Sequence, residues 1–207
     1  MSNNNKSVIK QLFTIGLPII LQSILQTMLP MIDQIMVGQL GDDVIAAIGI
    51  SGKLCNIYFF ILLAIAGVTA IYISQYWGSQ QLDMLPKTLR IPILSGSLCI
   101  GLLLIAAFVF PVPSMRLFTN NEEIAVMAAD FQKIYAVSAI PLMFTCLYSS
   151  LMMGTLKVKI PMISGIISVV LNTSLNYVLM FGVGPVKGMG AWGAVLATLI
   201  SRCVEFF

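Results

Sequence analysis

The sequence predicts an all-α integral membrane protein, and three observations support this fold class. Of its 207 residues, 58% are hydrophobic and only 9% are charged. Because a soluble domain is about 25% charged, this chain has too little polar surface to cover a globule in water. Its mean hydropathy of +0.98 points the same way. The apolar runs are also continuous, unlike the short alternating segments of a membrane β-barrel.

Charged residues, prolines and glycines divide the chain into six apolar segments. A transmembrane helix needs about 20 mainly apolar residues, which all but the last segment provide. The expected segments are 8–37, 44–77, 91–112, 124–153, 160–182 and 191–207. The first follows lysines but no small-residue cleavage pattern, so we expect a transmembrane helix and not a removable signal. The last is a marginal span with no polar tail, which suggests that the sequence stops inside a helix.

The short loops between these segments predict the orientation. Cytoplasmic loops carry an excess of lysine and arginine. Seven basic residues fall on the N-terminal side: Lys6, Lys10, Lys87, Arg90, Lys157, Lys159 and Arg202. Arg116 and Lys187 fall on the opposite side. We therefore expect a multi-pass protein of the plasma membrane with its N-terminus in the cytoplasm, and the net charge of +3 indicates topology, not nucleic-acid binding.

Several functions are excluded by what the sequence lacks. No loop is long enough for a catalytic domain, and in the loop before the fourth segment Thr119, Asn120 and the two glutamates that follow predict only a helix start. The chain has no histidine, the commonest metal ligand, and its four cysteines show no C-x-x-C spacing. The stretch GISGKL lacks the spacing of a phosphate-binding loop. We expect neither an enzyme nor a cofactor.

The first segment has one polar face in the middle of its apolar sequence. At 100° per residue, Gln22, Gln26 and Asp33 lie within about 40° of one another along roughly 16 Å of helix. Glutamines inside a membrane commonly bond to neighbouring helices, whereas a carboxylate there marks an ion pathway by default. Asp33 is therefore the candidate for exchanging a proton, a sodium ion or an organic cation. Pro18 and Pro30 bracket the middle of this segment and permit a bend.

The fifth segment carries a second polar stripe with a spacing of four residues. It consists of Ser164, Ser168, Asn172 and Asn176. Serines at this spacing are commonly packing contacts. The two asparagines are bulkier hydrogen-bonding groups on one helix face, and they are placed to address an ion, a ligand or Asp33.

The chain resembles the multidrug and toxic compound extrusion (MATE) transporters, most closely their bacterial members. The first segment has Pro18 and then DQIMVGQLGDDVIAAIG, which is similar to the family's D-x-x-x-V-G-x-L-G pattern. The stretch ISQYWGSQQLDML resembles its S-Q-x-x-G motif. The stretches GTLKVKIPM, NTSLN and GAVLAT resemble its G-x-x-K-x-P-M, N-x-x-x-[DN] and G-A-x-x-A-T run. The similarity covers essentially the whole chain in order.

The resemblance implies one lobe of a twelve-helix secondary antiporter, which exports cationic or amphipathic compounds in exchange for protons or sodium ions. This chain would be the N-terminal six-helix lobe, residues 1–207, with the C-terminal lobe absent. The family's cavity residues correspond to Gln26, Asp33, Asn172, Asn176, Thr198 and Ser149. Asp33 would also be the sodium ligand, if sodium is the coupling ion. Many members have Asp in place of Asn176, so Asp33 would carry most of the cation chemistry here.

Two other functions fit the same sequence. A lipid-linked oligosaccharide flippase of the same superfamily would line its cavity with basic residues for pyrophosphate, and only Lys53 and Lys133 are placed to do so. A truncated half-lobe that transports nothing by itself is the other alternative, and half of a dimer is a variant of it.

Overall fold

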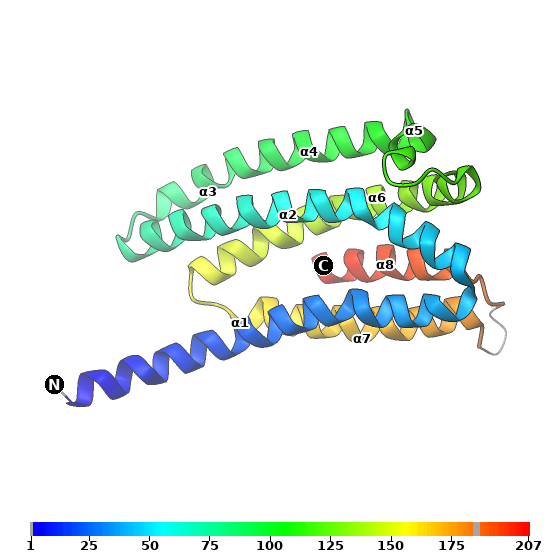
Figure 1. The fold of residues 1–207 in the computed structure, drawn as a ribbon. Helices are drawn as coiled ribbons and strands as arrows, with labels where there is room; N and C mark the ends of the chain where they lie inside the picture. Colours follow the sequence, from blue (N-terminus) through cyan, green and yellow to red (C-terminus); the bar gives the residue numbers. More distant parts are fainter. Residues whose placement is uncertain (1, 184–186) are drawn as a thin grey trace.

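The computed structural model describes residues 2–183 and 187–207, and these residues are almost entirely helical (Figure 1). The long helices are α1 (Ser2–Val37), α2 (Asp42–Gly78), α4 (Arg90–Phe108), α6 (Glu122–Gly154), α7 (Lys159–Phe181) and α8 (Ala191–Phe206). Short pieces connect some of them: η1 (Gly38–Leu40), η2 (Leu82–Met84), α3 (Leu85–Thr88) and α5 (Pro111–Arg116). In α1 the side chains of Pro18, Gln22, Gln26 and Pro30, among others, lie outside the described part of the chain.

The helices have the length and composition of membrane spans. Among the described residues, four stretches are long and apolar enough to cross a membrane: Asp42–Gly78, Leu82–Phe108, Glu122–Gly154 and Lys159–Phe181. Helix α8 has 16 residues, fewer than the about 20 that a span needs. The prediction of an all-α membrane protein is thus confirmed, while the number of six spans stays a prediction.

The third predicted segment, 91–112, is divided in two. Helix α4 ends at Phe108, and α5 begins at Pro111. Phe110, between them, has φ −124° and ψ 51°, which is not helical. A residue before proline is pushed out of the helical region by the proline ring, so the chain turns here.

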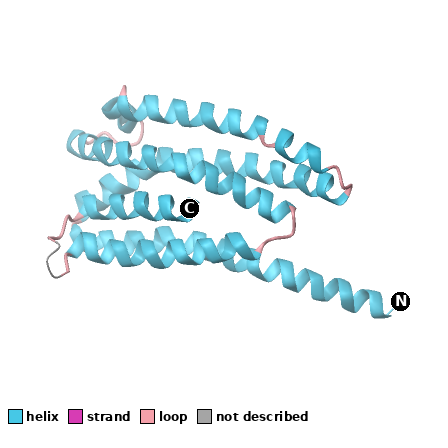
Figure 2. Cartoon of the chain, turned by 180° about the vertical axis from the view of Figure 1, so that it is seen from behind, coloured by secondary structure: helices cyan, strands magenta, loops and turns pink. Residues whose placement is uncertain are grey.

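The helices form an elongated bundle with α4 at one side and α1 with α7 at the other (Figure 1). Between these sides lie α2 with α6, and then α8. The view from behind shows the same order, and in both views the N-terminal part of α1 extends past the rest of the bundle (Figure 2). Helix α1 therefore has α7 as its principal neighbour.

Small residues allow the helices to approach closely. A buried cluster joins α2, α4 and α6 around Leu62, Leu103 and Met143. A Cβ atom on Gly96 of α4 would lie 2.7 Å from the sulfur of Met143, so any larger residue would require the Met143 side chain to shift. Such contacts are typical of membrane helices, where packing and not the exclusion of water drives helix association.

The start of α6 differs from the expected cap. Asn121, and neither Thr119 nor Asn120, is the N-cap residue of α6: its Oδ1 accepts hydrogen bonds from the amides of Glu123 (3.0 Å) and Ile124 (3.4 Å). Glu122 forms an exposed ion pair with Arg116 at 2.6 Å. As expected, the two glutamates belong to a helix start.

Candidate functional site

Asp33 meets a buried asparagine of a helix distant in sequence. It lies four residues before the end of α1 and is half-buried against α7. Asn176 of α7 is fully buried, and its Nδ2 donates a hydrogen bond to Asp33 Oδ1 at 2.5 Å. The bond forms because α1 and α7 pack side by side, which places Asp33 against Asn176. The sequence left an ion, a ligand or Asp33 open as the partner of the asparagines, and in the structure Asn176 contacts Asp33.

The contact continues into a third helix through the second asparagine. Asn176 Nδ2 also donates to Asn172 Oδ1 at 3.1 Å, one turn earlier on α7. Asn172 Nδ2 in turn donates to the hydroxyl of Ser201 on α8 at 3.1 Å, and both residues are buried. We call Asp33, Asn176, Asn172 and Ser201 the polar ladder. It connects α1, α7 and α8 through side-chain bonds.

One acceptor of the polar ladder is unused. Asn176 Oδ1 is buried, and it has no hydrogen-bond partner among the described residues. Leaving a buried acceptor unpaired costs about 1–3 kcal/mol, so such an atom in a native structure calls for a specific explanation. It lies on the same amide that binds the carboxylate of Asp33. The site therefore offers a carboxylate and an open amide oxygen within one buried group of residues.

A buried ion pair lies beside the earlier part of the same stripe on α7. Arg202 Nη1 is 3.1 Å from Glu205 Oε2, and the two side chains are 22% and 5% exposed. Ser168 donates to Glu205 Oε2 at 3.1 Å, and Ser164 donates to the backbone oxygen of Glu205 at 3.2 Å. All four members of the predicted stripe on α7 thus face a polar partner.

This ion pair was not predicted from the sequence. Arg202 was expected among the basic residues of the N-terminal side, and Glu205 was assigned no role. The signal that could have found the pair is the spacing of three residues between opposite charges in the last apolar segment, since such residues share one helix face. A carboxylate and a guanidinium inside an apolar segment are expensive unless they are paired or wet.

The other predicted site residues have looser connections to the polar ladder. Thr198 of α8 is half-buried; its hydroxyl donates to the carbonyl of Ala194 at 3.1 Å, and its own carbonyl accepts from Ser201 at 3.0 Å. Ser149 of α6 is half-buried and makes no hydrogen bond to the polar ladder within the part of the chain that the structure describes. Gln26 belongs to α1, but its side chain is outside the described residues.

The described residues contain no group of three or more His, Cys, Asp or Glu side chains that could hold a metal ion. The polar ladder has a single carboxylate, with amide and hydroxyl groups around it. Oxygen ligands of this kind suit hard cations, whereas zinc prefers nitrogen and sulfur ligands.

A bundle of membrane helices with a carboxylate–amide group in its interior defines the class of a helical membrane protein with a candidate cation site. The MatE family model matches residues 18–178, and the chain belongs to this family. It is 26% identical over 191 residues to the probable multidrug resistance protein YoeA of Bacillus subtilis, covering 91% of this chain and 41% of that protein. It is also 26% identical over 200 residues to the probable multidrug resistance protein NorM of Haemophilus ducreyi, again covering 41% of the relative.

Solved structures show the same fold. A crystal structure of MATE in complex with MaD3S superposes with a TM-score of 0.81 at 21% identity, covering 95% of this chain and 43% of that one. The chain therefore spans less than half the length of the relatives and structures that it matches.

Proposed function

We propose that this chain is the N-terminal six-helix lobe of a secondary antiporter in the plasma membrane, with its N-terminus in the cytoplasm. The complete transporter would export cationic or amphipathic compounds in exchange for protons or sodium ions. The family membership supports drug efflux, and so do the names of YoeA and NorM as probable multidrug resistance proteins. The share of about two fifths of each relative supports a single lobe, and the excess of lysine and arginine on one side supports the orientation.

One observation carries the proposal: the hydrogen bond from Asn176 to the Asp33 carboxylate, next to the open acceptor Asn176 Oδ1. A carboxylate inside a membrane helix is costly and is kept where it takes part in ion or substrate movement. Here its donor comes from a different helix. Any change in the charge of Asp33 therefore acts directly on the contact between α1 and α7.

Proton exchange would reverse the direction of this hydrogen bond. Ionised Asp33 can only accept, and it accepts from Asn176 Nδ2. A proton that arrives from water on one side of the membrane adds to a carboxylate oxygen and makes Asp33 a donor. A turn of the Asn176 amide would then present Oδ1, the open acceptor, to that donor. Release of the proton to the other side restores the first arrangement, and the two arrangements position α1 differently against α7.

Sodium coupling would use the same oxygen atoms. The second carboxylate oxygen of Asp33 and Asn176 Oδ1 accept no hydrogen bond among the described residues, whereas Asn172 Oδ1 already accepts one. Thr198 and Gln26 would add a hydroxyl and an amide oxygen, as the family resemblance implies. Sodium at Asp33 would displace the amide NH₂ of Asn176, so protons and sodium ions would compete for one site.

The flippase alternative has less support from the contacts of its basic residues. Lys133 is committed to an ion pair with Asp130 at 2.8 Å. Lys53 Nζ lies 5.6 Å from the centre of the Phe118 ring, in a cation–π contact. Neither lysine contacts the polar ladder among the described residues. A pyrophosphate-binding cavity would need such cations to be free and clustered.

A half-lobe that does not transport alone is the second candidate, and the 41% share of the relatives favours it. Export should then be absent for residues 1–207 and present when a second lobe is supplied. Reading the DNA that follows the codon for Phe207 tests this first, because a further frame with six apolar segments would encode that lobe. Co-expression of two copies of this chain tests the dimer.

The decisive experiment measures export of a cationic dye from cells or vesicles under imposed proton and sodium gradients. It uses the transport-competent form, whether that is the chain alone or the chain with its second lobe. Asp33→Asn should abolish gradient-driven export while the protein still inserts and melts cooperatively. Asp130→Asn is the matched control, because Asp130 is a half-exposed carboxylate paired with Lys133, and it should retain export. Unchanged export by Asp33→Asn would refute the proposed mechanism.

A further inference from the structure

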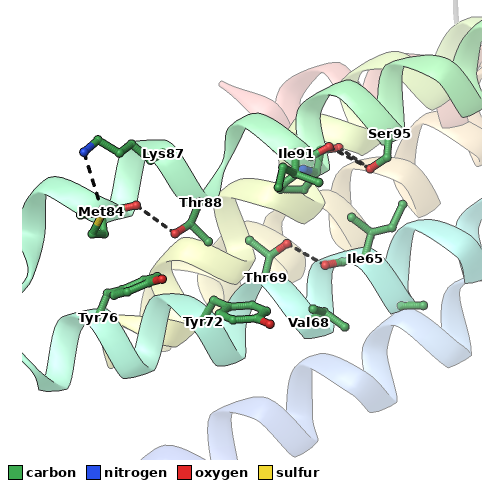
Figure 3. A pocket seen from close by; sticks show the side chains of 12 residues that line it. Ile65, Val68, Thr69, Tyr72, Tyr76, Met84, Lys87, Thr88, Ile91 and Ser95 are labelled. Carbon is green, nitrogen blue, oxygen red and sulfur yellow. Dashed lines mark hydrogen bonds between the residues drawn. The ribbon is translucent and has the colours of Figure 1, made fainter.

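A cavity lies on the α2–α4 side of the bundle, separate from the polar ladder. Its volume is about 630 Å³, and its walls come from α2 and from the η2–α3–α4 segment (Figure 3). Asp33, Asn176 and Ser201 belong to α1, α7 and α8 and contribute nothing to it. Whatever this cavity binds is therefore independent of the cation chemistry proposed above.

One part of the cavity is mainly apolar. Ala64, Ile65 and Val68 of α2 line one wall, and Ile91 and Pro92 of α4 line the other. Thr69 and Ser95 also line this part, and their hydroxyls are bonded to backbone carbonyls of their own helices. Val68 is 55% exposed and Ile91 is 77% exposed, so the two walls flank a groove that is open at the surface. A groove that is open at the surface of a membrane helix bundle and lined mainly by apolar side chains can accommodate an acyl chain.

The other part of the cavity is polar and lies where the helices end. Tyr76 is near the end of α2, while Lys87 and Thr88 form the end of α3 (Figure 3). The Thr88 hydroxyl donates a hydrogen bond to the carbonyl oxygen of Met84 at 2.9 Å. Among the described residues, Lys87 Nζ has the sulfur of Met84, at 3.9 Å, as its hydrogen-bond partner.

The positive charge at this end is not neutralised by the protein. Within the described ranges the ion pairs are Arg116–Glu122, Lys133–Asp130 and Arg202–Glu205. Lys87 belongs to none of them, and neither does the exposed Arg90 that begins α4. An unpaired ammonium group at the mouth of an apolar groove repels organic cations and attracts anions.

This end of the cavity also lies at the predicted cytoplasmic boundary of the membrane. Helix α2 ends at Gly78 and the chain re-enters through α3, in the loop that carries Lys87 and Arg90. Tyrosines such as Tyr76 are enriched at this level of a membrane. Basic pockets between transmembrane helices on the cytoplasmic side bind the headgroups of anionic lipids.

We propose that this cavity binds an anionic phospholipid, with its phosphate at Lys87 and an acyl chain in the groove between α2 and α4. A free phosphate would not need the apolar walls, and an exported cation would be repelled by Lys87. The site ties the α2–α3–α4 segment to the headgroup layer of one leaflet.

Trp77, which follows Tyr76 in α2, provides a reporter for the test. The chain has two tryptophans, and Trp192→Phe leaves Trp77 alone. This variant is placed in phosphatidylcholine vesicles that contain a graded fraction of phosphatidylglycerol with brominated acyl chains, or of phosphatidylcholine brominated in the same way. Brominated phosphatidylglycerol should quench Trp77 at a lower fraction than brominated phosphatidylcholine. Lys87→Gln should reduce this preference about fivefold.

Two further variants separate the cavity from general surface charge. Lys157→Gln removes an exposed lysine from the predicted cytoplasmic side, in the loop between α6 and α7, and should leave the preference intact. Ala64→Phe fills the apolar wall and should weaken quenching by phosphatidylglycerol although Lys87 is present. Equal quenching by both lipids, an equal loss in Lys157→Gln, or no effect of Ala64→Phe would overturn the proposal.

Discussion

The hydroxyl of Ser168 on α7 donates a hydrogen bond to the Glu205 carboxylate on α8 at 3.1 Å. The same carboxylate oxygen is paired with Arg202, and the side chain of Glu205 is 5% exposed. The bond joins two helices at a level where Ser164 of α7 also donates to the backbone oxygen of Glu205. It makes the Arg202–Glu205 pair the second charged group in the interior of this bundle, after Asp33.

Neutralising Glu205 should destabilise the protein more than breaking a surface pair. Glu205→Gln leaves the guanidinium of Arg202 without its counter-charge in a buried setting, and removing one partner of a buried pair costs several kcal/mol. Because Arg202 is 22% exposed, we expect a smaller loss of about 2 kcal/mol, measured as a lower thermal midpoint in detergent. Glu122→Gln is the control: its pair with Arg116 is exposed, so its loss should leave the thermal midpoint almost unchanged. Equal shifts in both variants would contradict the assignment.

Asn176→Asp should make stability depend on pH. The variant replaces the donor to Asp33 by a second carboxylate in a buried site, and two ionised carboxylates in contact repel each other. Protonation of either one relieves the repulsion and supplies a hydrogen-bond donor. The thermal midpoint of Asn176→Asp should therefore fall as the pH rises, relative to that of the parent chain. Asn172→Asp, one turn away and facing Ser201, should show a weaker dependence, and equal slopes for the variant and the parent would refute the prediction.

Gly193→Ala should weaken the packing of α8 on α7. A Cβ atom at Gly193 would collide with the backbone carbonyl of Leu179, which cannot turn aside as a side chain can. Forcing extra atoms into a packed contact typically costs about 1–3 kcal/mol. Gly101→Ala is the matched control, since nothing lies within 4 Å of a Cβ there and alanine favours the helix. A lower melting temperature for Gly193→Ala alone would confirm the close approach.

Local pattern predicted the helices and the polar stripe on α7, because hydropathy and a spacing of four residues are properties of one segment. The contact of Asp33 with Asn176 was one of three possibilities that the sequence left open, beside an ion and a ligand, because the spacing within one segment does not say which helix packs against it. The Arg202–Glu205 pair did not follow, because its burial depends on how α8 lies against Ser164 and Ser168. The cap of α6 was misplaced by one or two residues, as Asn121 competes with Thr119 and Asn120 for the same role and only geometry selects among them.

Helix α1 has a mechanical consequence that follows from its length and its single main neighbour. It contains 36 residues, a length of about 54 Å, and Asp33 lies near one end of it. If α1 tilted by about 10° at the contact with Asn176, its other end, some 46 Å away, would move by about 8 Å. A change of one hydrogen bond at Asp33 would thus be magnified along a lever arm, and the far end of α1 is where a distance probe would register the movement best.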